Sequence, residues 1–153
     1  MNKILTVLFA LISINTVVFA DNYTEISNTF KNYVNDANSY STNLPSYYVN
    51  NAKIVRVVNK KQGGRQTIII PYDRYLKELK SHSALAKTVK YKNTYTNQKI
   101  TKIGNDYKLT ATRIPRNDKT GLPCYFLFTK TNSGWKIKEE SMTTNVQTFL
   151  SAK

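Results

Sequence analysis

Hydrophobic positions follow a helical spacing in two separate parts of the first half of the chain. Between residues 23 and 37 the larger apolar side chains recur every three or four positions, which predicts a helix with one apolar side. A polar stretch follows, and Pro45 within it favours a turn and a short second helix that begins near this proline. Residues 72–85 return to the helical spacing, and Asp73 is well placed to favour the start of this third helix.

Strand patterns lie between and after these helices. The β-rich runs 54–58 and 67–70 flank a polar connector that contains Gly63 and Gly64, which predicts a hairpin because glycine accepts positive φ angles. After the third helix we expect a long antiparallel meander, with strands within residues 89–103, 107–114, 122–130 and 135–140. The tail, residues 145–153, has helical spacing again, but it is so short that its helix needs tertiary packing.

Alternation within two of these strands indicates which side chains face the core. Tyr107, Leu109 and Ala111 share one face of their strand, opposite a polar face. Trp135 and Ile137 likewise point the same way in the last strand. We therefore expect a sheet with one core side and one wet side.

Three short segments carry a resemblance to a known family: the hairpin that leads into residues 71–76, the turn at residues 103–107 and the segment 133–137. In this order they resemble the nuclear transport factor 2-like superfamily, also called SnoaL-like, and in particular its exported bacterial single-domain members. The resemblance implies an α+β fold, in which a cone-shaped, strongly curved antiparallel sheet wraps around the N-terminal helices and leaves a pocket at its mouth. It also implies that a homodimer is plausible, because many members dimerise through the open sheet face.

Residues 1–20 have the pattern of a secretory signal peptide. Lys3 supplies the positive region, residues 4–19 supply the apolar stretch, and residues 18–20 place small side chains at the expected cleavage positions. We therefore expect an exported protein, periplasmic or secreted. Residues 21–153 suit a single domain, with no transmembrane segment left after signal cleavage.

The expected mature chain is strongly basic. Loss of residues 1–20 removes one lysine and leaves 22 basic and 9 acidic side chains, a formal charge of +13. Such a charge favours acidic partners. Lys90, Lys92 and Lys102 share one parity on a strand, so we predict a polar stripe there that meets an anionic envelope component or an acidic protein. Export makes nucleic acid a less suitable partner.

Side chains suited to catalysis are few. The nine acidic residues fall mostly at predicted helix starts, turns or solvent faces, and the single histidine, His82, is placed after the third helix rather than on a pocket strand. Cys124 is the only cysteine, which excludes an intramolecular disulfide, and its apolar surroundings favour a buried thiol. No His, Cys or carboxylate side chains cluster as metal ligands would, so we expect neither a metal nor a cofactor.

These features favour an exported, non-enzymatic binding domain that holds a protein partner or a small apolar ligand in its cone pocket. The aromatic side chains expected at this pocket are Phe30, Tyr33, Tyr107, Phe126, Phe128 and Trp135. Two alternatives stay open. The first is an isomerase- or dehydratase-like enzyme of the same fold, with Tyr33 or an acid as its working group. The second is a basic module that binds an anionic polymer or an acidic protein.

Overall fold

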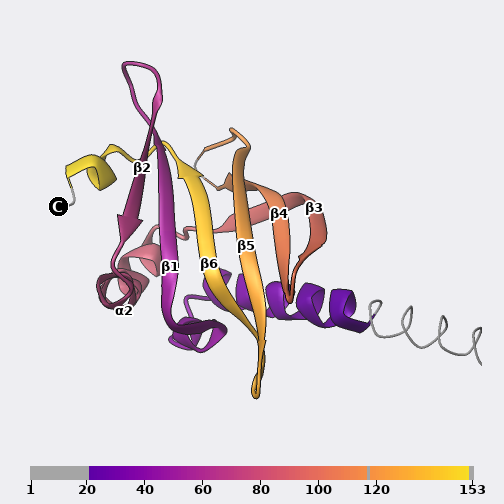
Figure 1. The fold of residues 1–153 in the computed structure, drawn as a ribbon. Coiled ribbons are helices and arrows are strands. Elements are labelled where there is room, and N and C mark those ends of the chain that lie inside the picture. Colours follow the sequence, from indigo (N-terminus) through magenta and orange to yellow (C-terminus); the bar gives the residue numbers. More distant parts are fainter. Residues whose placement is uncertain (1–20, 117, 152–153) are drawn as a thin grey trace, which may run out of the picture.

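A mixed sheet and two α-helices make up most of the computed structural model, which describes residues 21–116 and 118–151. The described part of the N-terminal helix covers residues 21–38, and the predicted signal peptide lies outside the described residues. The other elements follow along the chain as η1 (Leu44–Tyr47), β1 (Tyr48–Asn59), β2 (Arg65–Ile70), α2 (Tyr72–Thr88), β3 (Asn93–Ile103), β4 (Asp106–Pro115), β5 (Leu122–Thr131), β6 (Gly134–Thr144) and η2 (Gln147–Ser151) (Figure 1).

The six strands form one curled sheet in the order β2-β1-β6-β5-β4-β3. All neighbouring strands run antiparallel except β1 and β6, which are parallel. The parallel pair arises because the chain leaves β1 through β2, α2 and three meander strands before β6 returns beside it. The predicted α+β class with a strongly curved sheet is confirmed, and the structure adds this one parallel pair to the antiparallel sheet that we expected.

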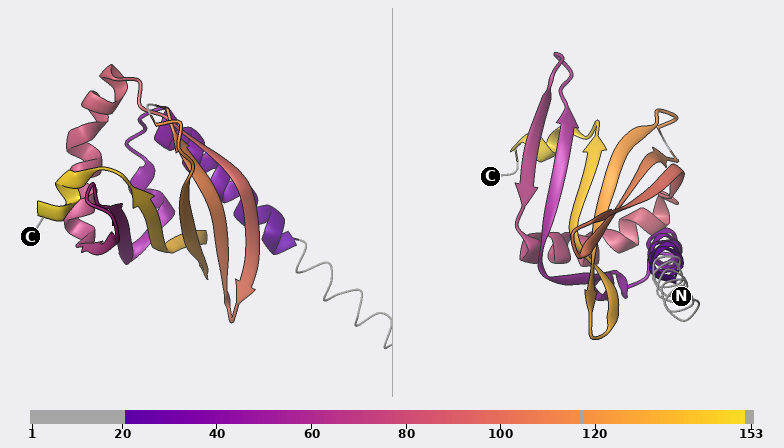
Figure 2. Two further views of the ribbon diagram at one scale, coloured as in Figure 1. Left: turned by 90° about the horizontal axis from the view of Figure 1, so that it is seen from above. Right: turned by 45° about the vertical axis from the view of Figure 1, so that its right-hand side comes forward.

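Both α-helices lie on the concave side of the sheet, each against a different half of it (Figures 1 and 2). The N-terminal helix buries Ile26, Phe30 and Tyr33, the three-and-four spacing seen in the sequence. The ring centroids of Phe30 and Tyr33 lie 4.9 and 5.5 Å from that of Phe126 on β5. The predicted first helix is therefore confirmed, and its apolar side packs into the core.

The hairpin and the β4 strand also form as predicted. β1 and β2 pair antiparallel, and Gly63 and Gly64 in their connection have φ angles of 90° and 78°. Such positive φ angles cost little for glycine only. On β4 the side chains of Tyr107, Leu109 and Ala111 are buried, as their shared parity indicated.

Three helical predictions need correction. The short second helix is a 3-10 turn, and the chain turns to β-strand at Tyr48. α2 begins with Asp73 in its first turn, as predicted, and it continues past residue 85 to Thr88. His82 lies inside this helix, which corrects the expectation that it follows the helix. The tail forms the 3-10 helix η2 instead of an α-helix. No helix in the described part of the chain has both the length and the apolar character needed to cross a bilayer.

The predicted lysine stripe does not form one strand face. Because α2 extends to Thr88, Lys90 lies in the following turn with a φ of 51°, and Lys92 still precedes the first residue of β3. Lys102 is on β3, but a register shift between Thr96 and Lys99 changes the parity of the strand. All three lysines are exposed, and their anionic partner remains a prediction.

Candidate functional site

A cavity of about 410 Å³ lies between α2, the C-terminal end of the N-terminal helix and the concave side of the sheet. This volume is within the range of small-molecule sites. The C-terminal segment contributes Val146 and Phe149, and the loop before η1 contributes Tyr40 and Ser41. The helices, strands and loops around it contribute Tyr33, Leu44, Arg56, Tyr75, Glu78, Leu79, His82, Tyr91, Asn93, Tyr95, Arg113 and Met142. We call this space the cone cavity.

Behind the wall of the cone cavity lies a fully buried carboxylate, Glu140 of β6. One of its oxygens, Oε1, is 2.7 Å from Nη2 of Arg56 on β1, and both side chains are at least nine-tenths buried. The other oxygen, Oε2, accepts hydrogen bonds from the hydroxyls of Tyr48 and of Tyr33, the latter at 3.2 Å. The hydroxyl of Tyr75 on α2 lies 3.1 Å from that of Tyr48 and closes the cluster.

A β-bulge in β6 turns Glu140 inward. Leu127 and Phe128 of β5 are adjacent, but their partners on β6 are Glu139 and Ile137, so Lys138 is the extra residue. Strict alternation from Ile137 would place Glu139 in the core and Glu140 in solvent. The extra residue shifts the alternation by one, which is how a bulge redirects side chains. Burial follows the shift: Glu140 is fully buried, whereas Glu139 pairs with Lys53 near the surface.

The buried charges in this cluster stabilise each other. Burial by itself lowers the pKa of Arg56, but the Glu140 charge beside it outweighs this effect and the pKa lies above its ordinary value. Burial is also the main cause that raises the pKa of Tyr33, Tyr48 and Tyr75, and the Glu140 carboxylate adds to it. The three hydroxyls therefore stay protonated at neutral pH. The cluster consists of hydrogen-bond donors around one carboxylate, whose two oxygens already have partners.

A second buried guanidinium, Arg113 of β4, lines the cone cavity without a carboxylate of its own. Nη1 donates to the hydroxyl of Tyr91 at 3.1 Å and to Oδ1 of Asn93 at 3.0 Å, and Nη2 donates to the carbonyl of Thr143 at 2.9 Å. Nε–H is buried and has no acceptor in the described part of the chain. Arg113 forms no ion pair within 4.0 Å among the described residues.

The α2 side of the cone cavity is more open to solvent. Glu78 lines it, but its carboxylate pairs with Arg74 one turn earlier, at 2.9 Å. His82 lines it one turn later, from an exposed position. The side chains of Leu79 and Ala86 complete this wall. His82 falls within the helical pattern of residues 72–85, so the expectation that it is placed after the helix is wrong.

Of the six aromatic side chains expected at the pocket, only Tyr33 lines the cone cavity. All six are buried in one core cluster. Phe30 lines a second cavity, while Tyr107, Phe126, Phe128 and Trp135 line neither of the two cavities described here. Tyr107 and Trp135 pack edge-to-face, with ring centroids 5.2 Å apart. These four side chains belong to the core cluster, and their role as ligand contacts stays a prediction.

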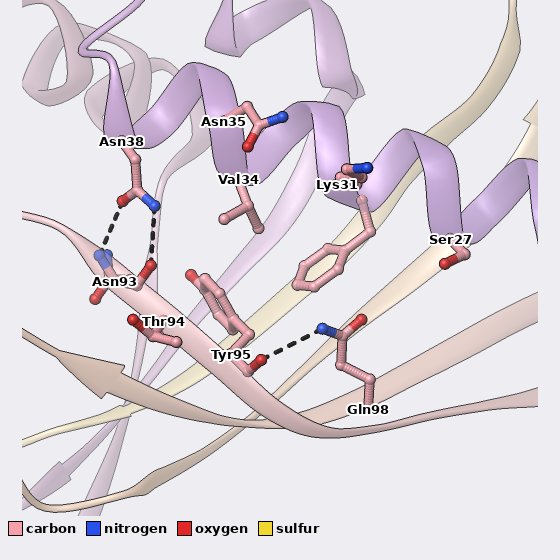
Figure 3. A pocket seen from close by; sticks show the side chains of 10 residues that line it. Ser27, Lys31, Val34, Asn35, Asn38, Asn93, Thr94, Tyr95 and Gln98 are labelled. Carbon is pink, nitrogen blue, oxygen red and sulfur yellow. Dashed lines mark hydrogen bonds between the residues drawn. The ribbon is translucent and has the colours of Figure 1, made fainter.

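The second cavity is a groove between the N-terminal helix and β3, also of about 410 Å³. Figure 3 shows that its labelled side chains are mostly polar, with Ser27, Lys31 and Asn35 on the helix side. Asn38 closes one end, because its side-chain amide donates to the carbonyl of Asn93 and accepts from the amide N–H of Asn93, both at 2.9 Å. The groove has no buried charge among its lining residues, and it follows the line where the N-terminal helix meets β3.

Sequence reasoning missed the three charged side chains that define the site, although a signal existed for two of them. Arg56 shares strand parity with Ile54 and Val58, which are both buried. Arg113 shares parity with Ala111 and the other buried side chains of β4. An arginine at a core-facing position of a strand indicates a buried functional or structural charge. Glu140 had no such signal, because the bulge reverses its parity.

Of three comparisons with known proteins, the one with solved structures finds this architecture. No family model matches the sequence, and no curated protein matches it. A solved nuclear transport factor 2-like protein with a cystatin-like fold from Novosphingobium aromaticivorans is 14% identical, with a TM-score of 0.64 over 84% of this chain and 85% of that chain. A candidate scytalone dehydratase from the same organism is 13% identical, with a TM-score of 0.63 over 83% of this chain and 86% of that one.

A further solved structure, a candidate dehydratase of the nuclear transport factor 2-like family from Streptomyces avermitilis, is 13% identical and has a TM-score of 0.60 over 81% of this chain and 96% of that chain. Identities this low carry information on the fold alone, since one fold supports many activities. The curled sheet, the two helices on its concave side and these likenesses together show that the chain has the nuclear transport factor 2-like fold.

Proposed function

We propose that this protein is an exported, non-enzymatic binding protein that holds a small, largely apolar ligand in its cone cavity. The observation that carries the proposal is that the Glu140 carboxylate is buried and already paired. This carboxylate is fully buried, does not line the cavity, and already binds Arg56, Tyr33 and Tyr48. A general base must reach the proton that it abstracts, and Glu140 is sealed from any ligand by its own partners.

The cavity wall itself supports binding. Leu44, Leu79, Met142 and Phe149 supply apolar surface, and they come from four separate elements that the fold brings together. Arginine and tyrosine side chains supply the few polar contacts. A mainly apolar cleft with a small number of polar groups is the usual form of a small-molecule site.

Ligand-dependent stabilisation tests the proposal. Purified full chain is heated with a panel of apolar small molecules, and a binder present at one hundred times its Kd raises Tm by about 5 °C or more. Ala86→Trp, which fills the cone cavity from α2, abolishes this shift. Ala84→Trp is the matched control, since Ala84 is exposed on the same helix and does not line the cavity. A panel without any binder, or equal shifts in both variants, contradicts the proposal.

Export is tested separately by fractionation. We expect the protein outside the cytoplasm, because residues 1–20 have the pattern of a signal peptide that is cleaved after Ala20. Its measured mass should be that of a chain whose first residue is Asp21. Full-length protein that stays in the cytoplasm contradicts this part of the proposal and leaves ligand binding unaffected.

One observation favours an enzyme as the second candidate. Tyr33 and His82 both line the cone cavity, so a phenol side chain and an imidazole side chain border one space. An isomerase or dehydratase would then lose turnover of carbonyl substrates in both Tyr33→Phe and His82→Gln. Measured turnover that survives His82→Gln excludes this arrangement.

A further inference from the structure

We propose that the ligand of the cone cavity carries a carboxylate on its apolar body, and that Arg113 binds this carboxylate. The inference rests on the proposed function and specifies the ligand class of the same cavity. It starts from a charge in the cavity wall that the described protein leaves without a counter-ion.

The charges around the cone cavity do not balance among the described residues. Arg56 is neutralised by Glu140, and Glu78 by Arg74. Arg113 is 5% exposed, and its side-chain hydrogen bonds to Tyr91, Asn93 and Thr143 all go to neutral oxygens. A buried guanidinium is costly without a compensating anion. A ligand carboxylate in the cavity supplies that anion.

Asp118 does not fill this role. Hydrogen bonds from Thr120 are the main cause that lowers the pKa of Asp118, followed by one from Asn145, and the charge of Arg113 is the smallest influence named for it. Its carboxylate accepts from the backbone N–H of Thr120 at 3.0 Å and from Nδ2 of Asn145 at 2.8 Å. No oxygen of Asp118 lies within ion-pair distance of Arg113.

The polar groups near Arg113 complement a hydrogen-bond acceptor. Tyr91 and Asn93 already hold one side of the guanidinium, which fixes its orientation. Tyr95 also lines the cavity, and its pKa is raised mainly by burial, so its hydroxyl remains a donor. A planar guanidinium beside the phenol donor of Tyr95 matches a carboxylate, which accepts through two oxygens.

The rest of the wall requires an apolar body on the same ligand. Met142, Leu79 and Phe149 line the cavity together with Arg113. A free inorganic anion would leave this surface in contact with water. An acid with an alkyl or aryl chain covers it and keeps its charged end at Arg113.

The test compares probes that share one carbon chain and differ in the head group. Decanoate, decanol and decanamide are titrated into the full chain by calorimetry, with acetate as the head group alone. We expect decanoate to bind about tenfold more tightly than decanol or decanamide, because a charge-assisted hydrogen bond is stronger than a neutral one. Acetate is expected to bind far more weakly than decanoate.

Arg113→Gln is expected to reduce the preference for decanoate over decanol to near parity, and Arg113→Lys to keep a part of it. Arg116→Gln is the matched control, since Arg116 is exposed and does not line the cavity.

Equal binding of decanoate and decanol by the unaltered protein overturns the inference without any variant, while the proposed function stands. If acetate binds as tightly as decanoate, the apolar body is wrong. If none of the probes binds, the proposed function fails and this inference with it.

Discussion

At the scale of single residues, Arg56 and Glu140 show how a buried charge is kept in this small core. The two side chains lie 2.7 Å apart and are almost fully removed from water. Tyr33 and Tyr48 satisfy the second carboxylate oxygen. Such a pair contributes little over a well-packed apolar pair, but removal of one partner leaves an uncompensated charge.

A double-mutant cycle measures this dependence. Arg56→Met is expected to lower the free energy of unfolding by about 3–5 kcal/mol, because Glu140 is left buried and unpaired. Adding Glu140→Leu should restore a large part of the loss. Urea denaturation gives the three values, and Lys53→Met, which removes a half-exposed partner of Glu139, serves as a control worth about 1 kcal/mol or less. A double variant that is less stable than either single one contradicts the pairing.

The thiol of Cys124 is buried in the core. Burial raises the pKa of Cys124 to about 12. Its Sγ–H donates to the carbonyl of Ala111 at 3.4 Å. Because the thiolate is the reactive form, a thiol reagent should modify the native protein far more slowly at neutral pH than it modifies the chain in urea. Equal rates in the two conditions would place the thiol at the surface.

At the scale of elements, the bulge at Lys138 decides which of two neighbouring glutamates belongs to the core. Both have the same side chain, and only the strand geometry separates them. After the bulge Glu140 and Met142 continue the inward face that Trp135 and Ile137 begin. The strand thus changes parity without leaving the sheet.

Matched variants of the two glutamates test the bulge. Glu140→Gln removes the charge that pairs with Arg56 and should cost about 3–5 kcal/mol of unfolding free energy. Glu139→Gln weakens contacts to Lys53 and Tyr125 near the surface and should cost about 1 kcal/mol or less. Chemical denaturation of both variants gives the comparison. Similar losses in the two would contradict this assignment, and a larger loss in Glu139→Gln would mean that Glu139 is the inward residue.

At the scale of the whole molecule, the two helices and the curled sheet enclose a core that is rich in tyrosine. The N-terminal helix covers one half of the sheet and α2 the other (Figure 2). Residues of both helices line the cone cavity between them. Burial is the leading cause that raises the pKa of the core tyrosines Tyr33, Tyr48, Tyr75 and Tyr95. It also raises the pKa of Tyr47 and Tyr125, both to about 12.

This distribution predicts a loss of stability in alkali. Below about pH 10 tyrosines are protonated in both states, so their contribution is complete. Above it the unfolded chain ionises first while the folded core keeps its protons, so the free energy of unfolding falls as pH rises. Urea denaturation across this range measures the slope, which Tyr33→Phe should reduce. A phenolate absorbance that develops fully before the structure is lost would contradict the prediction.

Local patterns in the sequence determined the helix that carries Ile26, Phe30 and Tyr33, the glycine-linked hairpin, the alternation on β4 and the order of elements. Each depends on residues close together in the chain, whose periodicity already states which side is apolar. The sequence also held the signal for Arg56 and Arg113, because both share parity with buried neighbours.

Only the tertiary structure decided how these parts make a site. The parallel pairing of β1 with β6 brings Arg56 to Glu140 across more than eighty residues of chain. The bulge at Lys138 turns Glu140 inward, and the position of α2 beside the sheet brings His82 to the cavity. Strand register, bulges and helix ends respond to packing against distant elements, so the hydrophobic pattern alone does not specify them.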